Sequence, residues 1–217
     1  MSRLNILFAL LIFFNSCIEK NKKSEVENKK ELNNIKNDST GFFLPEPYKN
    51  VVDNISIFLP ENYTVLDSIS GNLNLDNYND MILVLKKNNE EKTSDVIDNP
   101  EKRPLFILIG EPNNHYKLIE RNDNSVYCID CGGMMGDPYV RIVIKQGYFS
   151  IEHYGGSSWR WKRIITYKYS KEDNNWFLHK DGSESFNISE PEKIKKTIKT
   201  TKDFGKVLFK DFNIYEE

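Results

Sequence analysis

The sequence predicts an all-β fold, mainly antiparallel sheet of propeller-blade-like or β-sandwich type, with at most one short helix. From Phe42 onward, short segments rich in β-branched and aromatic residues alternate with turns made of Asn, Asp, Gly and Pro. Connections such as 146–147 and 172–175 have the length and composition of hairpin turns, so we expect neighbouring strands to be antiparallel. A parallel sheet is excluded because too few helices are available to cover its faces.

The predicted strands follow one another along the whole domain. They are 51–59, 63–69, 81–86, 105–109, 116–121, 139–145, 148–154, 159–169, 176–180 and 207–212. The stretch 190–200 is predicted as the helix, because Ser189 can cap it, Pro191 suits its first turn, and Ile194 and Ile198 are four residues apart.

Period-two alternation indicates which face of a strand is buried. In 148–154, Phe149, Ile151 and His153 share one face, and we expect this face to be inside. In 159–169, we expect the face that carries Trp159 and Trp161 to pack inward as well.

Length and charge limit the classes of function. The 217 residues suit one globular unit with an appendage. Lys and Arg total 30 against 32 Asp and Glu, with a net charge of -2, so the chain has no basic excess for binding nucleic acid. Three His and three Cys are a small supply of catalytic and metal-binding side chains.

The amino terminus has the three parts of a secretion signal: Arg3, an apolar run at 4–14, and Asn15-Ser16-Cys17. The run is shorter than the ~20 residues of a membrane-spanning helix. This segment resembles the lipobox of bacterial lipoproteins, although Asn15 departs from the usual pattern. The resemblance implies cleavage before Cys17, acylation of that residue, and a membrane anchor in the bacterial cell envelope, with the outer membrane as the expected location. The alternative is a soluble secreted protein in which Cys17 is incidental.

Three regions follow from these features. Residues 1–17 are the signal peptide, and 18–40, which are rich in Lys, Glu and Asn, are predicted to be a flexible tether. Residues 41–217 are predicted to form a single β-rich domain.

The segment 71–80 has the spacing of a cation-binding loop. Oxygen-bearing side chains alternate at Asn72, Asn74, Asp76 and Asp80, and the carbonyl of Tyr78 falls between the last two. Calcium binds six to eight oxygens and accepts such a set. We expect Asn77 to take the left-handed conformation that the turn needs. The alternative is a loop whose side chains hydrogen-bond to its own backbone, with no ion bound.

This loop, with the apolar strand after it, resembles the FG-GAP or VCBS repeat of integrin-like β-propellers. The match spans 71–85 and occurs once, so the sequence does not support a full propeller. By position, the resemblance makes Asn72, Asn74, Asp76, Tyr78 and Asp80 the calcium ligands. Asn72 replaces a carboxylate of the family pattern, so the expected affinity is weak, on the order of millimolar.

Cys128-Ile129-Asp130-Cys131 is followed by a glycine-rich loop. A Cys128–Cys131 disulfide is the default in an oxidising compartment. The alternatives are free thiols, a metal site, or a redox-active pair resembling thioredoxin, but Gly132-Gly133 and Pro138 favour a loop over the helix of that family.

Residues 153–163 combine aromatic and basic side chains around a flexible turn. His153, Tyr154, Trp159 and Trp161 could bind a glycan or an anionic group, or the tryptophans could be core residues. A nucleophile at Ser157 or Ser158 with His153 as base is a further alternative. With the cysteine loop, this tract resembles a group of envelope lipoproteins that carry a similar Cys-x-x-Cys-Gly-Gly loop, a resemblance that implies no activity.

Three functional hypotheses remain. The preferred one is a lipid-anchored envelope protein that acts as a binding or structural module, stabilised by calcium and the disulfide, with a glycan or another envelope protein as partner. The second is an enzyme, either a thiol–disulfide oxidoreductase or a hydrolase. The third is a carbohydrate-binding surface protein.

Overall fold

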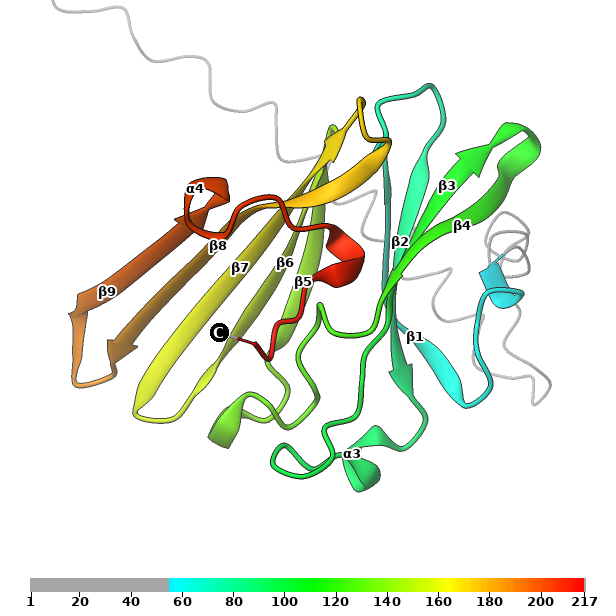
Figure 1. Ribbon diagram of the computed structural model, residues 1–217. Coiled ribbons are helices and arrows are strands. Elements are labelled where there is room, and N and C mark those ends of the chain that lie inside the picture. Colours follow the sequence, from blue (N-terminus) through cyan, green and yellow to red (C-terminus); the bar gives the residue numbers. More distant parts are fainter. Residues whose placement is uncertain (1–54, 217) are drawn as a thin grey trace, which may run out of the picture. The chain divides into compact units, whose positions relative to one another are not determined.

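Two antiparallel sheets make up most of the domain. The computed structural model describes residues 55–216, which lie within one compact unit, Glu46–Glu217. The strand order is β1-β2-β3-β4 in the first sheet and β5-β6-β7-β8-β9 in the second (Figure 1). The all-β, mainly antiparallel prediction is confirmed, and the two open sheets are consistent with a β-sandwich.

The elements have the following bounds. The first sheet contains β1 (Tyr63–Gly71), β2 (Asp80–Lys87), β3 (Leu105–Glu111) and β4 (His115–Asn122). The second contains β5 (Tyr139–Lys145), β6 (Tyr148–Gly156), β7 (Trp159–Ser170), β8 (Asn175–Asn187) and β9 (Glu190–Thr200). The short helical pieces are α3 (Glu90–Thr93), α4 (Thr201–Phe204), η1 (Pro112–Asn114), η2 (Gly133–Met135) and η3 (Phe209–Asp211).

The main core lies between the two sheets. Ile82 and Ile107 from the first sheet pack in one cluster with Phe149, Ile151 and Ile165 from the second, and all five are fully buried. The inward face predicted for 148–154 is therefore confirmed. Removal of this apolar surface from water is the principal stabilising contribution to the fold.

The first sheet is apolar on its other face too. A second cluster contains Met81, Leu83, Leu85, Phe106 and Leu108, with Ile55, Phe58 and Leu59 packed against it. Strand β2 is thus buried on both faces, which explains why its sequence is continuously apolar instead of alternating.

Residues 205–216, which we call the strap, pass between β4 and β8 (Figure 1). The strap buries Phe209, Phe212 and Ile214 in the main core. The Asn122 side-chain amide donates to the carbonyl oxygens of Phe209 and Phe212, and the Ile214 N–H donates to the Asn124 carbonyl at 2.8 Å. The strap therefore ties the first sheet to the second.

The helix predicted at 190–200 is wrong, because this stretch forms strand β9. Residues four apart share a face on a strand as well as on a helix, so the spacing of Ile194 and Ile198 does not distinguish the two. Pro191 lies where the pairing shifts between Ser185 and Asn187, a bulge at a sheet edge that tolerates proline.

Two predicted strands also need correction. At 207–212 the chain makes one isolated bridge, Phe177 to Leu208, and then the η3 turn, because Phe209 and Phe212 fill the core instead of joining a ladder. Of 51–59, residues 51–54 lie outside the described residues. Ile55 to Leu59 forms a helical turn closed by hydrogen bonds from the Phe58 and Leu59 N–H groups.

The inward prediction for the tryptophan-bearing face holds only toward the carboxyl end of β7. Ile165 and Tyr167 are fully buried, Trp161 is half-buried, and Trp159 is 63% exposed. The strand extends beyond the part of the sheet that the core covers. Among residues 55–216, no helix is long and apolar enough to cross a membrane.

Candidate functional site

The loop between β1 and β2 is held by its own side chains. Asp80 is fully buried, and its carboxylate accepts the N–H groups of Leu73 (2.6 Å), Asn74 (3.2 Å) and Gly110 (3.0 Å). Burial raises the pKa of Asp80, and these backbone hydrogen bonds oppose the shift. Asp80 thereby connects the loop to β3.

The exposed part of the loop is hydrogen-bonded in the same manner. Asn72 Oδ1 accepts the Leu75 N–H at 2.6 Å, Asn74 Oδ1 accepts the Asp76 N–H at 3.0 Å, and Asp76 Oδ1 accepts the Tyr78 N–H at 2.7 Å. The Asn74 side-chain amide donates to Asp76 Oδ2 at 2.7 Å.

Each side chain in the predicted calcium set therefore already bonds within the loop. These bonds explain the loop's composition without an ion, and calcium binding stays a prediction. The left-handed residue is Leu75 (φ 64°) and not Asn77.

Cys128 and Cys131 form a disulfide, with their Cα atoms 5.1 Å apart. Cys128 is fully buried and Cys131 is half-buried. Asp130 lies with the two sulfurs in the sole cluster of His, Cys, Asp or Glu ligand atoms found within residues 55–216, all within 4.8 Å. Disulfide sulfurs are not thiolates, so this cluster does not have the ligands of a metal site.

An ion triad that the sequence reasoning missed fixes the cysteine loop. Arg103 is fully buried and bonds to Glu90 Oε1 at 2.5 Å and to both Asp137 oxygens at 2.7 and 2.8 Å. Burial alone would lower the pKa of Arg103, but the bonds to Asp137 and Glu90 raise it above the usual value. The triad joins α3, the approach to β3 and the end of the glycine loop. No local spacing pattern connects these three positions.

His153 is a core residue. It is fully buried, and its ring packs edge-on against Tyr127, with centroids 5.0 Å apart, and against Tyr139 at 6.3 Å. Burial and the nearby Arg163 and Arg103 lower its pKa to about 3. Its Nε2 accepts the Tyr127 N–H at 3.4 Å, while its Nδ1 has no partner among residues 55–216.

The other three predicted binding residues are not brought together. Trp159 is exposed at the first position of β7, and Tyr154 pairs with Lys162. Trp161 lies opposite Gly155 and makes an edge-on contact with Tyr127, with centroids 5.6 Å apart. Of these three residues, only Trp161 lines the larger hollow, which lies between the second sheet and the strap.

That hollow, which we call the groove, has a volume of about 620 Å³ and lies between the β7–β9 part of the second sheet and the strap. Its sheet side includes Trp161, Arg163, Asp181, Ser183, Thr197 and Lys199. Its other side includes Phe204, Val207, Asp211, Phe212, Asn213 and Glu216. The volume is typical of ligand sites.

The groove wall is rigid at Arg163. The guanidinium bonds to both oxygens of Asp181, at 3.0 and 2.7 Å, and also to the Tyr127 hydroxyl (2.7 Å) and the Ile214 carbonyl (3.1 Å). Burial lowers the pKa of Arg163, but Asp181 and Tyr127 raise it above the usual value. The same cation thus holds β8, the Tyr127 loop and the strap together.

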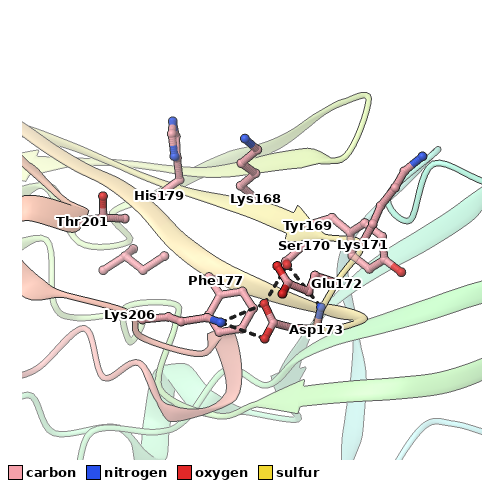
Figure 2. Close-up of a pocket in the computed structure, with 11 residues that line it drawn as sticks. Lys168, Tyr169, Ser170, Lys171, Glu172, Asp173, Phe177, His179, Thr201 and Lys206 are labelled. Carbon is pink, nitrogen blue, oxygen red and sulfur yellow. Dashed lines mark hydrogen bonds and ion pairs between the residues drawn. The ribbon is translucent and has the colours of Figure 1, made fainter.

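A smaller hollow of about 500 Å³ lies beside the turn between β7 and β8 (Figure 2). There the Lys206 ammonium bonds to both Asp173 oxygens at 2.8 Å and lies 4.5 Å from the Phe177 ring centroid. Lys206 and Ser170 lower the pKa of Asp173. In Figure 2, His179 and Lys168 point away from the Asp173–Lys206 pair, so the basic groups do not converge on one anion.

No protein-family model, curated protein or solved structure matches the chain. Sequence reasoning missed the groove because it ended one strand at 180 and made 190–200 a helix. Residues 181–187 contain only one large apolar side chain, Phe186, so no period-two alternation marks this part of the strand.

Proposed function

We propose that this chain is a lipid-anchored protein of the bacterial cell envelope that acts as a binding module, with the groove as its ligand site. Two observations support the location. The first seventeen residues end at Cys17 in a lipobox-like pattern, and the Cys128–Cys131 disulfide suits an oxidising compartment outside the cytoplasm.

The groove is the observation that supports binding. It combines a half-buried indole, apolar residues from the strap and several polar side chains in one hollow of about 620 Å³. Apolar surface beside polar groups that can orient a ligand is a usual feature of small-molecule sites. The Arg163–Asp181 pair fixes the groove wall before any ligand arrives.

The geometry favours binding over the two enzyme alternatives. A thiol–disulfide oxidoreductase needs an accessible attacking sulfur, whereas Cys128, the first cysteine of the pair, is fully buried and Cys131 is half-buried. A hydrolase needs a base that can reach its nucleophile and hold a proton near neutral pH. His153 is buried with a pKa of about 3, whereas Ser157 and Ser158 are exposed on a turn.

The anchor is tested with the full chain expressed in bacteria. We expect wild-type protein to incorporate labelled palmitate and to fractionate with membranes, and Cys17→Ser to lose both properties. Mass spectrometry of the wild-type protein provides a second test. An unmodified amino terminus that lies before Cys17 would contradict the lipid anchor.

Binding at the groove is tested with two variants on neighbouring positions of β9. Thr197 lines the groove, whereas Ile198 is 63% exposed on the opposite face of the strand, so Thr197→Trp fills the groove and Ile198→Trp is its matched control. Solubilised envelope material should raise the thermal midpoint of wild type and Ile198→Trp but not of Thr197→Trp. Equal responses of all three proteins, or no response, would contradict a ligand site in the groove.

A further inference from the structure

We infer that the groove binds a neutral carbohydrate, with Trp161 stacking on one face of a sugar ring and the polar side chains of β8, β9 and the strap bonding to its hydroxyl groups. This inference rests on the proposed binding function and gives the ligand its chemical class. It is carried by the position of the indole, the polar groups across from it, and the charge of the lining.

The indole of Trp161 is held in place by Gly155 and Tyr127. Trp161 pairs directly with Gly155, and a Cβ at Gly155 would lie 2.6 Å from Cζ2 of the ring, so only glycine leaves room for it. Tyr127 contacts the ring edge-on from the side. A large aromatic surface that is fixed and still half-exposed suits the apolar C–H face of a sugar ring.

The polar groups form cross-strand rows beside the indole. Arg163, Ser183 and Thr197 are direct partners across β7, β8 and β9, and Asp181 pairs with Lys199 in the adjacent row. These rows offer hydroxyl, carboxylate and ammonium groups within one hollow. Sugar hydroxyl groups both donate and accept hydrogen bonds, and such a mixed set satisfies both roles.

The charge of the lining decides against an anionic ligand. The groove contains three basic side chains, Lys162, Arg163 and Lys199, and three acidic ones, Asp181, Asp211 and Glu216. Arg163 is already bonded to Asp181 through two nitrogens. A phosphate or acidic ligand needs an excess of cations that converge on it, which this lining does not have.

The groove also has an apolar part. Leu178 and Phe212 are buried at the base of the groove, and Phe204 and Val207 are half-buried beside them. A purely polar ligand would leave this apolar surface in contact with water, whereas a sugar ring has both an apolar face and a polar rim. The groove matches that amphipathic shape.

The test uses the acylated full chain, extracted from membranes in a detergent without a sugar head group. The probe is an array of neutral hexose and N-acetylhexosamine oligosaccharides, with uronic-acid oligosaccharides as the anionic comparison. We expect wild type to bind neutral oligosaccharides. Binding should weaken about tenfold or more in Trp161→Ala and in Thr197→Trp.

Two control variants separate the groove from other exposed residues. Trp159→Ala and Ile198→Trp should bind as wild type does, because neither residue lines the groove. Thr197→Trp changes an exposed residue of an edge strand, so its fold is expected to survive even if Trp161→Ala proves unstable. A thermal melt of each variant checks this point.

The possible results are distinguishable. Preference for the uronic-acid probes, absence of binding to every sugar, or equal weakening in the control variants would overturn the carbohydrate inference. If envelope material still shifts the thermal midpoint of wild type but not of Thr197→Trp while no sugar binds, the carbohydrate inference fails and the binding module stands.

Discussion

Gly155 lies against the indole of Trp161, and the two residues are partners across β6 and β7. An added Cβ at Gly155 would come within 2.6 Å of the ring and 2.9 Å of the Gly132 Cα atom. Gly132 also accepts the Gly156 N–H at 2.8 Å. The cysteine loop, the end of β6 and the wall of the groove are therefore packed against one another in a single stack.

Gly155→Ala should displace the indole from this stack. We expect weaker ligand binding in the groove and a change in tryptophan fluorescence and its quenching by acrylamide. The matched control is Gly182→Ala on β8, where the nearest atom to an added Cβ is 3.9 Å away, an ordinary contact. Identical spectra and binding for the two variants would show that the Trp161 position does not depend on Gly155.

Arg103→Met should destabilise the domain by about 3–5 kcal/mol, because it leaves the buried carboxylate of Glu90 without its cation and also removes the partner of Asp137, whose side chain is 38% exposed. Arg121→Met is the control, since Arg121 and Asp123 form a pair with side chains 49% and 40% exposed. Such a pair contributes about 1 kcal/mol or less. Urea unfolding measures both, and similar losses would contradict a stabilising role for the buried Arg103–Glu90 pair.

His153 predicts a loss of stability in acid. Its pKa is about 3 in the folded protein, below the unfolded value near 6.5, so the unfolded chain binds the extra proton between these limits. The stabilisation from neutral His153 is complete above pH 6.5 and is lost as the pH falls toward 3. The contribution changes the unfolding equilibrium constant by at most about tenfold per pH unit.

The pH effect is measured by urea unfolding between pH 7 and pH 4 in wild type, His153→Phe and His115→Gln. The phenylalanine removes the titrating group, and His115 is an exposed control. We expect a shallower pH dependence in His153→Phe alone. If the free energy of unfolding depends on pH equally in all three proteins, the loss of stability in acid comes from carboxylates and not from His153.

The two carboxylates of the loop between β1 and β2, Asp80 and Asp76, should contribute differently to stability. Asp80→Asn should lower stability by about 1–3 kcal/mol in the presence of a chelator, because an amide cannot accept all three backbone N–H groups that Asp80 accepts. Asp76 is exposed, so Asp76→Asn should have a smaller effect under the same conditions. Equal losses from the two variants would contradict the role given to Asp80.

Calcium is tested in the same thermal experiment. We expect the wild-type midpoint to be higher in calcium than in chelator, because a tenfold excess of calcium over the dissociation constant adds about 1.4 kcal/mol to the free energy of unfolding. Asp76→Asn should reduce that difference. Equal wild-type midpoints in calcium and chelator would show that the loop does not bind calcium. The hydrogen bonds within the loop would then explain its composition.

The double variant Cys128→Ser and Cys131→Ser should lose about 2 kcal/mol, the cost expected for a bridge that closes so short a loop. Reducing agent should lower the stability of wild type to the same extent and leave the variant unchanged. Denaturant unfolding under both conditions provides the measurement. A wild-type protein insensitive to reduction would show that the bridge adds nothing to stability.

The fold was predictable from local patterns where those patterns have one physical meaning. The limits of β5 were predicted correctly, and the buried face of β6 follows from the alternation of Phe149 and Ile151. The pattern at 190–200 has two meanings, because Ile194 and Ile198 share a face on either a helix or a strand. Pairing with β8 settles the conformation, and that contact is not local.

The site was less predictable than the fold. Trp161 and Trp159 are two residues apart on one face, yet only Trp161 lies beside the groove, because the strap reaches the sheet near Arg163 and not near Trp159. The Arg103 triad joins residues distant in sequence for the same reason. Such contacts depend on which loops lie next to each other in the folded domain. A single sequence has no local pattern that predicts contacts between distant loops.

The strap also determines how the domain would respond to mechanical force. Asn122 and Asn124 hold it to the first sheet, while Arg163 and Leu178 hold it to the second. A pulling force applied beyond residue 216 would break these hydrogen bonds one after another. The hydrogen bonds between the strands of the two sheets would break later, because they would be sheared together. The force at which the domain begins to open is then set by the twelve residues of the strap and not by the nine strands found within residues 55–216.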